Sequence, residues 1–145
     1  ESMKMKGCFG LTELRGGSNV RAMETTAHYL PEKKEIVINT PNKAAVKWWL
    51  GNAAYEATHC VVFAKLLMPN GDGQLIDRGL HPFLVRIRRE DNNEACDGVV
   101  IGDCGDKLGL NGIDNGFLGF DNVVIPQENM LDRFGSINDR GDYIN

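Results

Sequence analysis

The stretch Ala57–Leu67 reads ATHCVVFAKLL, and its β-branched, aromatic and apolar residues decide the fold class. Such residues suit a pleated strand, and a run that is apolar on both faces is typical of a strand inside a sheet. We therefore predict a central strand here. Shorter strand signals lie on both sides of it, at Gly7–Leu11, Thr25–Leu30, Glu35–Thr40, Ala44–Leu50, Leu80–Arg88, Val99–Asp103 and Gly116–Ile125.

The segments between these strands carry turn signals rather than long helices. Pro31–Lys34 is a polar four-residue connection that predicts a β-hairpin, and Met68–Gly79, with Pro-Asn-Gly-Asp-Gly, predicts a mobile loop. Helical periodicity is weak, so that only Ser18–Glu24 and Gln127–Arg133 suit a helical turn. Many short strands with regular turn signals predict an all-β barrel or sandwich with short helical turns.

Composition narrows the class of protein further. The 145 residues suit one domain, and 42% hydrophobic with 25% charged residues is an ordinary globular mixture. A net charge of −4 argues against nucleic acid as the main partner, and no apolar run approaches the ~18 residues of a membrane span. No CxxC spacing occurs, so we interpret the cysteines as reduced packing residues, with no metal site: Cys8, Cys60, Cys96 and Cys104.

Two segments carry a possible binding chemistry. Residues 7–19 read GCFGLTELRGGSN and residues 47–53 read KWWLGNA. Together they offer hydroxyl and backbone donors, close backbone access at glycines and a flat apolar wall, which a planar redox cofactor needs. Taken alone, Thr12 also suits an ordinary turn, and Gly16–Asn19 suits either a phosphate-binding loop or a plain one.

The paired tryptophans have two interpretations. If Lys47–Ala53 is a strand, Trp48 and Trp49 lie on alternate faces, so that one enters the core and the other forms a wall of the site. The alternative is that both are core residues. The arginines at 86, 88 and 89 would suit coenzyme A phosphate, although a solvated strand edge is the interpretation we favour.

The order and spacing of the two segments resemble the middle domain of acyl-CoA oxidases, flavin-dependent relatives of acyl-CoA dehydrogenases. A third similar segment, GIDNGFLGFDNVVIPQENML, spans Gly112–Leu131. The resemblance implies a small antiparallel β-barrel that lies between two helical domains in the whole enzyme. We accordingly expect a middle domain at 1–137 and a linker stub at 138–145 towards a missing C-terminal helical domain. The start at Glu1, without an initiator methionine, also leads us to expect a fragment.

The same resemblance implies FAD as cofactor and assigns the site residues. In the family a threonine hydroxyl and neighbouring backbone groups bond the polar edge of the flavin, and a Gly-Ser pair lies against cofactor and acyl-CoA. The implied cofactor-binding residues are Leu11, Thr12, Gly17, Ser18, Trp49 and Gly51, with Ser18 also contacting substrate.

The residues after Trp49 bear on the electron acceptor. Dehydrogenases carry Trp-Ile-Thr-Asn here and oxidases commonly Trp-Ile-Gly-Gly, so that Gly51 is oxidase-like and Asn52 dehydrogenase-like. Glycine leaves space beside the flavin, and we hypothesise that this space admits oxygen.

The family's reaction, if it applies, converts fatty acyl-CoA to trans-2-enoyl-CoA and returns electrons to oxygen as hydrogen peroxide, in peroxisomes or glycosomes. The resemblance also implies a homodimeric parent whose catalytic glutamate lies in the C-terminal helical domain. We therefore expect no catalytic residue in this chain and an inactive fragment. Two alternatives stay open: a dehydrogenase relative with a protein electron acceptor, and a non-enzymatic binding module on the same barrel.

Overall fold

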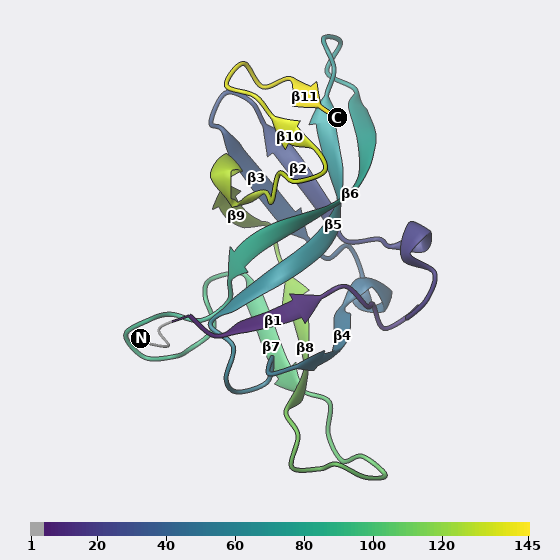
Figure 1. Ribbon diagram of the computed structural model, residues 1–145, viewed down its shortest axis with the longest axis vertical. Helices are drawn as coiled ribbons and strands as arrows, with labels where there is room; N and C mark the ends of the chain where they lie inside the picture. Colours follow the sequence, from purple (N-terminus) through teal and green to yellow (C-terminus); the bar gives the residue numbers. More distant parts are fainter. Residues whose placement is uncertain (1–4) are drawn as a thin grey trace.

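The computed structural model describes residues 5–145 and is mostly β-structure, as predicted (Figure 1). Three short 3-10 turns, and no long helix, connect the strands within this range; none of its helices is long and apolar enough to cross a membrane. The strands are β1 (Gly7–Gly10), β2 (Thr26–Leu30), β3 (Glu35–Asn39), β4 (Lys47–Gly51), β5 (His59–Pro69), β6 (Leu75–Arg86), β7 (Val99–Asp103), β8 (Asn115–Phe120), β9 (Val123–Pro126), β10 (Ser136–Ile137) and β11 (Tyr143–Ile144). The turns are η1 (Val20–Ala22), η2 (Lys43–Ala45) and η3 (Gln127–Asn129).

Strand β5 is central, as its sequence predicts. Along one edge it pairs antiparallel with β6, and along the other it pairs with β1 over its first half and with β2 over its second. Both of these latter pairings are parallel, so the prediction of a purely antiparallel barrel is wrong. Parallel partners need a long connection, and the many residues between β1 and β5 provide it. The predicted hairpin at Pro31–Lys34 is confirmed by the antiparallel pairing of β2 with β3.

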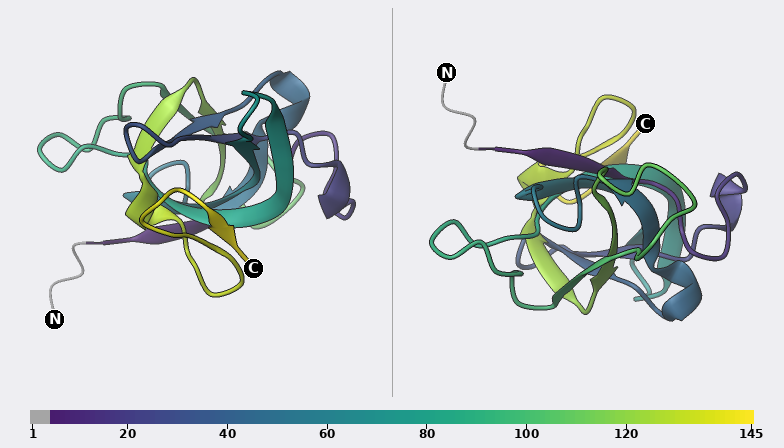
Figure 2. Two further views of the ribbon diagram at one scale, coloured as in Figure 1. Left: turned by 90° about the horizontal axis from the view of Figure 1, so that it is seen from above. Right: turned by 90° about the horizontal axis from the view of Figure 1, so that it is seen from below.

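The sheet is curled but does not close. One sheet runs β1-β5-β2-β3-β9, with β6 on β5, while β4, β8 and β7 form a second sheet (Figure 1). The end views in Figure 2 show how the strands curl around the core. The two sheets meet through isolated backbone hydrogen bonds, such as those from Trp48 N to Thr12 O and from Thr40 N to Phe120 O. The fold is therefore an open half-barrel and not the closed barrel predicted, because irregular backbone at these junctions interrupts the ladders.

The predicted mobile loop at Met68–Gly79 is wrong in most of its length. Strand β5 continues through Pro69, β6 begins at Leu75, and these two residues pair with each other. Only Asn70–Gln74 forms the turn, in which the Asn70 side chain accepts from the backbone N–H groups of Asp72 and Gln74. Cross-strand pairing thus overrides the local turn signals of glycine and proline.

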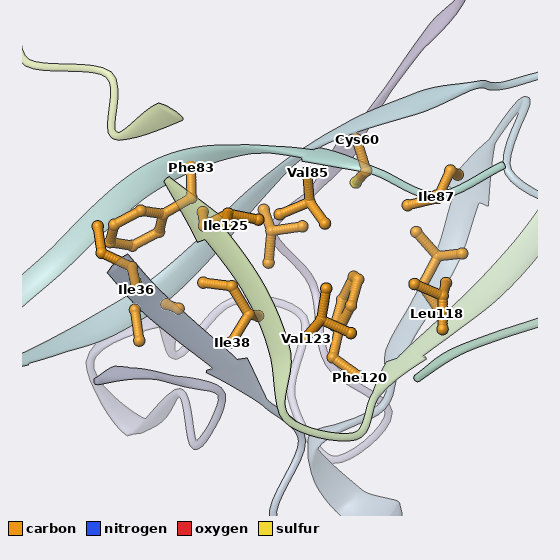
Figure 3. Packing of buried hydrophobic residues seen from close by; sticks show 14 of the residues in the cluster. Ile36, Ile38, Cys60, Phe83, Val85, Ile87, Leu118, Phe120, Val123 and Ile125 are labelled. Atoms are coloured by element: carbon orange, nitrogen blue, oxygen red, sulfur yellow. The ribbon is translucent and has the colours of Figure 1, made fainter. Parts of the chain in front are cut away.

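The core lies on the concave face of the curled sheet. Burial alternates strictly along β5, and the inward residues pack against apolar residues of β3, β6, β8 and β9 (Figure 3). The outward residues of β5 are only partly buried. This strand is therefore apolar on both faces, but the fold buries only one of them fully. Fully buried members include Ile36, Ile38, Cys60, Val62, Leu66, Phe83, Val85, Ile87 and Leu118.

The C-terminal residues lie on this body. Strand β11 pairs with β10, and Tyr143 packs against the core, with its hydroxyl 3.2 Å from the His81 ring nitrogen. The boundary between a domain at 1–137 and a linker at 138–145 stays a prediction.

Candidate functional site

The segment after β1 is held against β4 by reciprocal hydrogen bonds. The Thr12 hydroxyl donates to the carbonyl oxygen of Trp48 at 2.6 Å, and the Trp48 N–H donates to the carbonyl oxygen of Thr12 at 3.0 Å. Because a hydroxyl has one proton, Thr12 Oγ1 can offer a ligand only its lone pairs while this bond exists. Thr12 is therefore a positioned acceptor.

A β-bulge, and not simple alternation, separates the two tryptophans. Lys47 faces Leu118 and Leu50 faces Gly116, so β4 uses one residue more than β8 over this interval. Trp49 takes a φ of +64°, in the left-handed region that bulky residues rarely adopt. The bulge thus redirects the second tryptophan.

The bulge gives the two tryptophans different environments. Trp48 is partly buried and stacks on Phe117, with ring centroids 5.5 Å apart. Trp49 is 54% exposed, and the Lys107 ammonium lies 5.9 Å from its ring centroid. The alternative that both are core residues is therefore wrong, and Trp49 is free to form a wall.

The two predicted segments line one cavity of about 490 Å³, which is open to solvent. Four predicted site residues come together there, although they lie almost forty residues apart in the chain: Leu11, Thr12, Trp49 and Gly51. Gly17 lines a neighbouring cavity of about 270 Å³, which shares Leu11 and Thr12 with the first. Ser18 lines neither cavity. The large cavity is also lined by Gly7, Cys8, Phe9, Leu50 and Asn52.

The glycines of the site leave open space beside the backbone. A Cβ added at Gly16, Gly17 or Gly51 would meet no described atom within 4 Å, and none of the three has a left-handed φ. Packing within the described chain therefore does not require glycine at these positions. By contrast, a Cβ at Gly116 would lie 2.5 Å from Ala54 N. Bare backbone beside an exposed indole fits a flat ring that approaches closely.

A buried ion pair that the sequence motifs did not predict lies beneath the site. The Lys47 side chain is fully buried, and its Nζ donates to the Leu11 carbonyl and to Glu13 Oε1, both at 3.2 Å. Glu13 also accepts from Glu24 N, Thr25 N and the Thr25 hydroxyl. The pair thus ties the Leu11–Glu13 segment to β4 and to the residues just before β2. The one sign of this ion pair in the sequence was Lys47, a lysine at a position of a predicted strand that points into the core.

The ion pair shapes the protonation of both partners. Burial lowers the pKa of Lys47, against the opposing effect of Glu13. Burial raises the pKa of Glu13, but hydrogen bonds from Thr25 and from the Glu24 and Thr25 backbone, together with Lys47, outweigh it, and the pKa is lowered. The fold therefore favours a charged Glu13.

Arg88 supports the turn that follows Gly51. It is buried, and its Nη1 donates to the carbonyl oxygens of Ala53 at 3.0 Å and Ala57 at 2.7 Å. The expectation of a solvated strand edge is wrong for this residue, although it fits Arg86 and Arg89, which pair with exposed carboxylates. The Nη2 of Arg88 donates to a third carbonyl oxygen, that of Ala54, at 2.5 Å, so Arg88 is a structural donor to the segment Ala53–Ala57.

Comparison with known proteins agrees with this architecture. The family described as "Acyl-CoA dehydrogenase, middle domain" matches residues 8–123. The chain belongs to this family, whose class is the β-structured middle domain of flavin-dependent acyl-CoA enzymes.

Within the family the similar proteins are acyl-CoA oxidases, as the sequence motifs predicted. The chain is 47% identical over 144 residues to the peroxisomal acyl-coenzyme A oxidase 2 of Arabidopsis thaliana, covering 99% of this chain and 21% of that protein. It is 46% identical over 142 residues to human peroxisomal acyl-coenzyme A oxidase 3, covering 98% of this chain and 20% of that protein.

Solved structures give the same result. Arabidopsis acyl-CoA oxidase 1 superposes with a TM-score of 0.91 at 41% identity, over 98% of this chain and 21% of that one. Caenorhabditis elegans acyl-CoA oxidase-2, described as bound with FAD, ascaroside-CoA and ATP, gives 0.91 at 36% identity, over 98% and 21%. The chain thus spans about a fifth of the length of these relatives.

Proposed function

We propose that this domain forms one wall of the FAD and acyl-CoA site of an acyl-CoA oxidase. The observation that carries the proposal is the cavity of about 490 Å³, in which the exposed face of Trp49 and the bare backbone at Gly51 lie beside the fixed acceptor Thr12. When bound, FAD supplies the acceptor for the hydride that leaves the acyl chain.

Each residue of the chain has a binding role in this proposal. Thr12 Oγ1 accepts a hydrogen bond at the polar edge of the ring, since its own proton is held by Trp48. Trp49 covers an apolar part of the ring, and Leu11 and Gly51 present main-chain groups. Gly17 and Ser18, on the loop beside the smaller cavity, contact the cofactor, and Ser18 also contacts the acyl-CoA.

The proposed reaction of the whole enzyme oxidises fatty acyl-CoA to trans-2-enoyl-CoA and reduces oxygen to hydrogen peroxide in the peroxisome, by a homodimer. The base that removes the proton α to the thioester comes from outside this chain, and the domain by itself is inactive. Its contribution is to hold and orient the ring and the substrate, and to leave room for oxygen beside Gly51.

The test uses the full-length enzyme and separates its two half-reactions. Wild-type enzyme should retain FAD, be reduced anaerobically by fatty acyl-CoA, and consume oxygen with peroxide formation. Gly51→Leu should lose flavin, because its side chain fills the open space, whereas Gly71→Leu is the matched control, since Gly71 also has open space but lies in the β5–β6 turn. Equal flavin content in both variants would contradict the assigned site.

The rival dehydrogenase function has one specific observation in its favour, the dehydrogenase-like Asn52. Rapid reduction by acyl-CoA without oxygen consumption, together with electron transfer to a protein acceptor, would support that rival. A purified full-length protein that binds no flavin would instead support the binding module.

A further inference from the structure

Two thiols lie opposite each other on neighbouring strands, and one of them, Cys8, lines the site. Strands β1 and β5 pair in parallel with Cys8 directly opposite Cys60, and both side chains belong to the buried core. Adjacent strands lie about 4.8 Å apart, within the Cα separation of about 4.4–6.8 Å that a disulfide spans. Cys8 and Cys60 are both free thiols.

The position of the Cys60 sulfur brings it over β1. A Cβ built at Gly10 would lie 2.8 Å from Cys60 Sγ, so that the missing side chain at Gly10 provides the space in which this sulfur sits. Figure 3 shows Cys60 on β5 among the buried side chains. Cys60 is fully buried, and the neighbouring thiol is Cys8.

Cys8 is the more exposed member of the pair. It lines the cavity of about 490 Å³ together with Thr12, Trp49 and Gly51, and it is 9% exposed. A hydrogen bond from the Cys60 thiol lowers the pKa of Cys8, outweighing burial, whereas the same bond and burial raise the pKa of Cys60. The difference in exposure makes Cys8 the attacking thiol and Cys60 the resolving thiol, and the lowered pKa of Cys8 agrees with this assignment because the thiolate is the nucleophile.

We propose that Cys8 and Cys60 are a peroxide-sensitive thiol pair, in which Cys8 is oxidised from the cavity and Cys60 then closes a disulfide between β1 and β5. Hydrogen peroxide is the oxidant. That the enzyme itself generates this peroxide beside Cys8 rests on the proposed function; the reactivity of the pair does not.

The chemistry has two balanced steps. The Cys8 thiolate attacks one oxygen of hydrogen peroxide, an S–O bond forms as the O–O bond breaks, and the leaving hydroxide takes a proton to give water. Cys60 then loses its proton as its sulfur attacks the sulfur of the Cys8 sulfenic acid; an S–S bond forms, the S–O bond breaks, and the leaving hydroxide takes that proton to give a second water. Two thiols are oxidised and one peroxide is reduced.

The chain offers a direct readout by peptide mapping. Trypsin cuts after lysine and arginine, which places Cys8 in the peptide Gly7–Arg15 and Cys60 in Trp48–Lys65. The other two cysteines, Cys96 and Cys104, fall together in Glu90–Lys107 and are the internal control. The full-length enzyme is treated with added hydrogen peroxide, blocked with iodoacetamide and digested.

The expected product is Gly7–Arg15 joined to Trp48–Lys65, separable with dithiothreitol, while Glu90–Lys107 keeps both thiols. Cys60→Ala should halt at a Cys8 sulfenic acid that dimedone captures, and Cys8→Ala should leave Cys60 reduced because it is buried. Loss of the product after prior denaturation in urea would show that the folded register is required.

Three results would overturn the proposal: both thiols intact, Cys96 or Cys104 oxidised first, or Cys8 carried to the sulfinic acid in the wild type while Cys60 stays a thiol. A second arm replaces added peroxide by acyl-CoA and oxygen. If the disulfide forms with added peroxide but not during turnover, the result would support the thiol pair and contradict the proposed oxidase function instead.

Discussion

Lys47→Met is the substitution that most directly tests how the site is held. Methionine keeps much of the length of the side chain but removes the ammonium, which donates to the Leu11 carbonyl and to Glu13 and contacts Met23 Sδ at 3.3 Å. Glu13, only 8% exposed, then becomes a buried charge without its cation.

The expected loss of folding free energy depends on the hydrogen bonds that Glu13 keeps in the variant. Removing one partner of a buried ion pair commonly costs about 3–5 kcal/mol of folding free energy. Glu13 keeps hydrogen bonds from Glu24 N, Thr25 N and the Thr25 hydroxyl, so we expect the lower end, about 3 kcal/mol. For a domain of this size that corresponds to a fall in Tm of roughly 6–12 °C.

The assay is urea and thermal unfolding of the isolated chain, followed by circular dichroism. Lys65→Met is the matched control, because Lys65 lies half-buried on β5, with its side chain outside the ion pair, and should change the free energy of unfolding by less than about 0.5 kcal/mol. The double variant with Glu13→Gln should cost less than the sum of the single variants, since both remove one interaction.

The result that would refute the reasoning is a Lys47→Met chain as stable as the Lys65→Met chain. A second refutation would be strict additivity with Glu13→Gln, which would show that the two side chains do not interact. In the full-length enzyme Lys47→Met should also weaken flavin retention, because the Leu11 carbonyl loses its donor.

Four further outcomes follow from the same structure. Thr12→Ala in the full-length enzyme should weaken flavin binding by about 1–3 kcal/mol, with Thr12→Ser restoring it; equal flavin content in all three forms would remove the hydroxyl from the site. Gly51→Thr should slow reoxidation by oxygen more than reduction by acyl-CoA, and stopped-flow traces with unchanged reoxidation would contradict the oxygen-access hypothesis. Arg88→Lys should lower the free energy of unfolding by about 2–3 kcal/mol, because lysine lacks the planar guanidinium that donates to three carbonyls at once; urea curves that coincide with wild type would refute this. The pKa of Glu13 is lower in the folded chain than the ordinary carboxyl value of 4.5. Its contribution to the free energy of unfolding is therefore complete above pH 4.5 and is lost as the pH falls through the folded pKa. Glu13→Gln should accordingly make the free energy of unfolding depend less on pH in this acid range.

Short sequence patterns were sufficient to predict the types of secondary structure and the family. The β-branched, aromatic and apolar residues of 57–67 predicted the central strand, and the polar Pro31–Lys34 connection predicted the hairpin between β2 and β3. The two segments at 7–19 and 47–53 predicted which residues would meet, and four of them line one cavity. The strand and the hairpin depend on neighbours within a few positions, which the chain order states directly, whereas the meeting of the two distant segments was implied by the family resemblance.

Tertiary structure decided the features that depend on which strand edges meet. The chain order does not state that β1 lies parallel to β5, that Cys8 faces Cys60, or that Lys47 reaches Glu13. The bulge at Trp49 arises because Lys47 and Leu50 must both point inward against β8, and only one extra residue between them permits it. Because such contacts join residues some 30 to 50 positions apart, their geometry comes from the packed sheet and not from local preference.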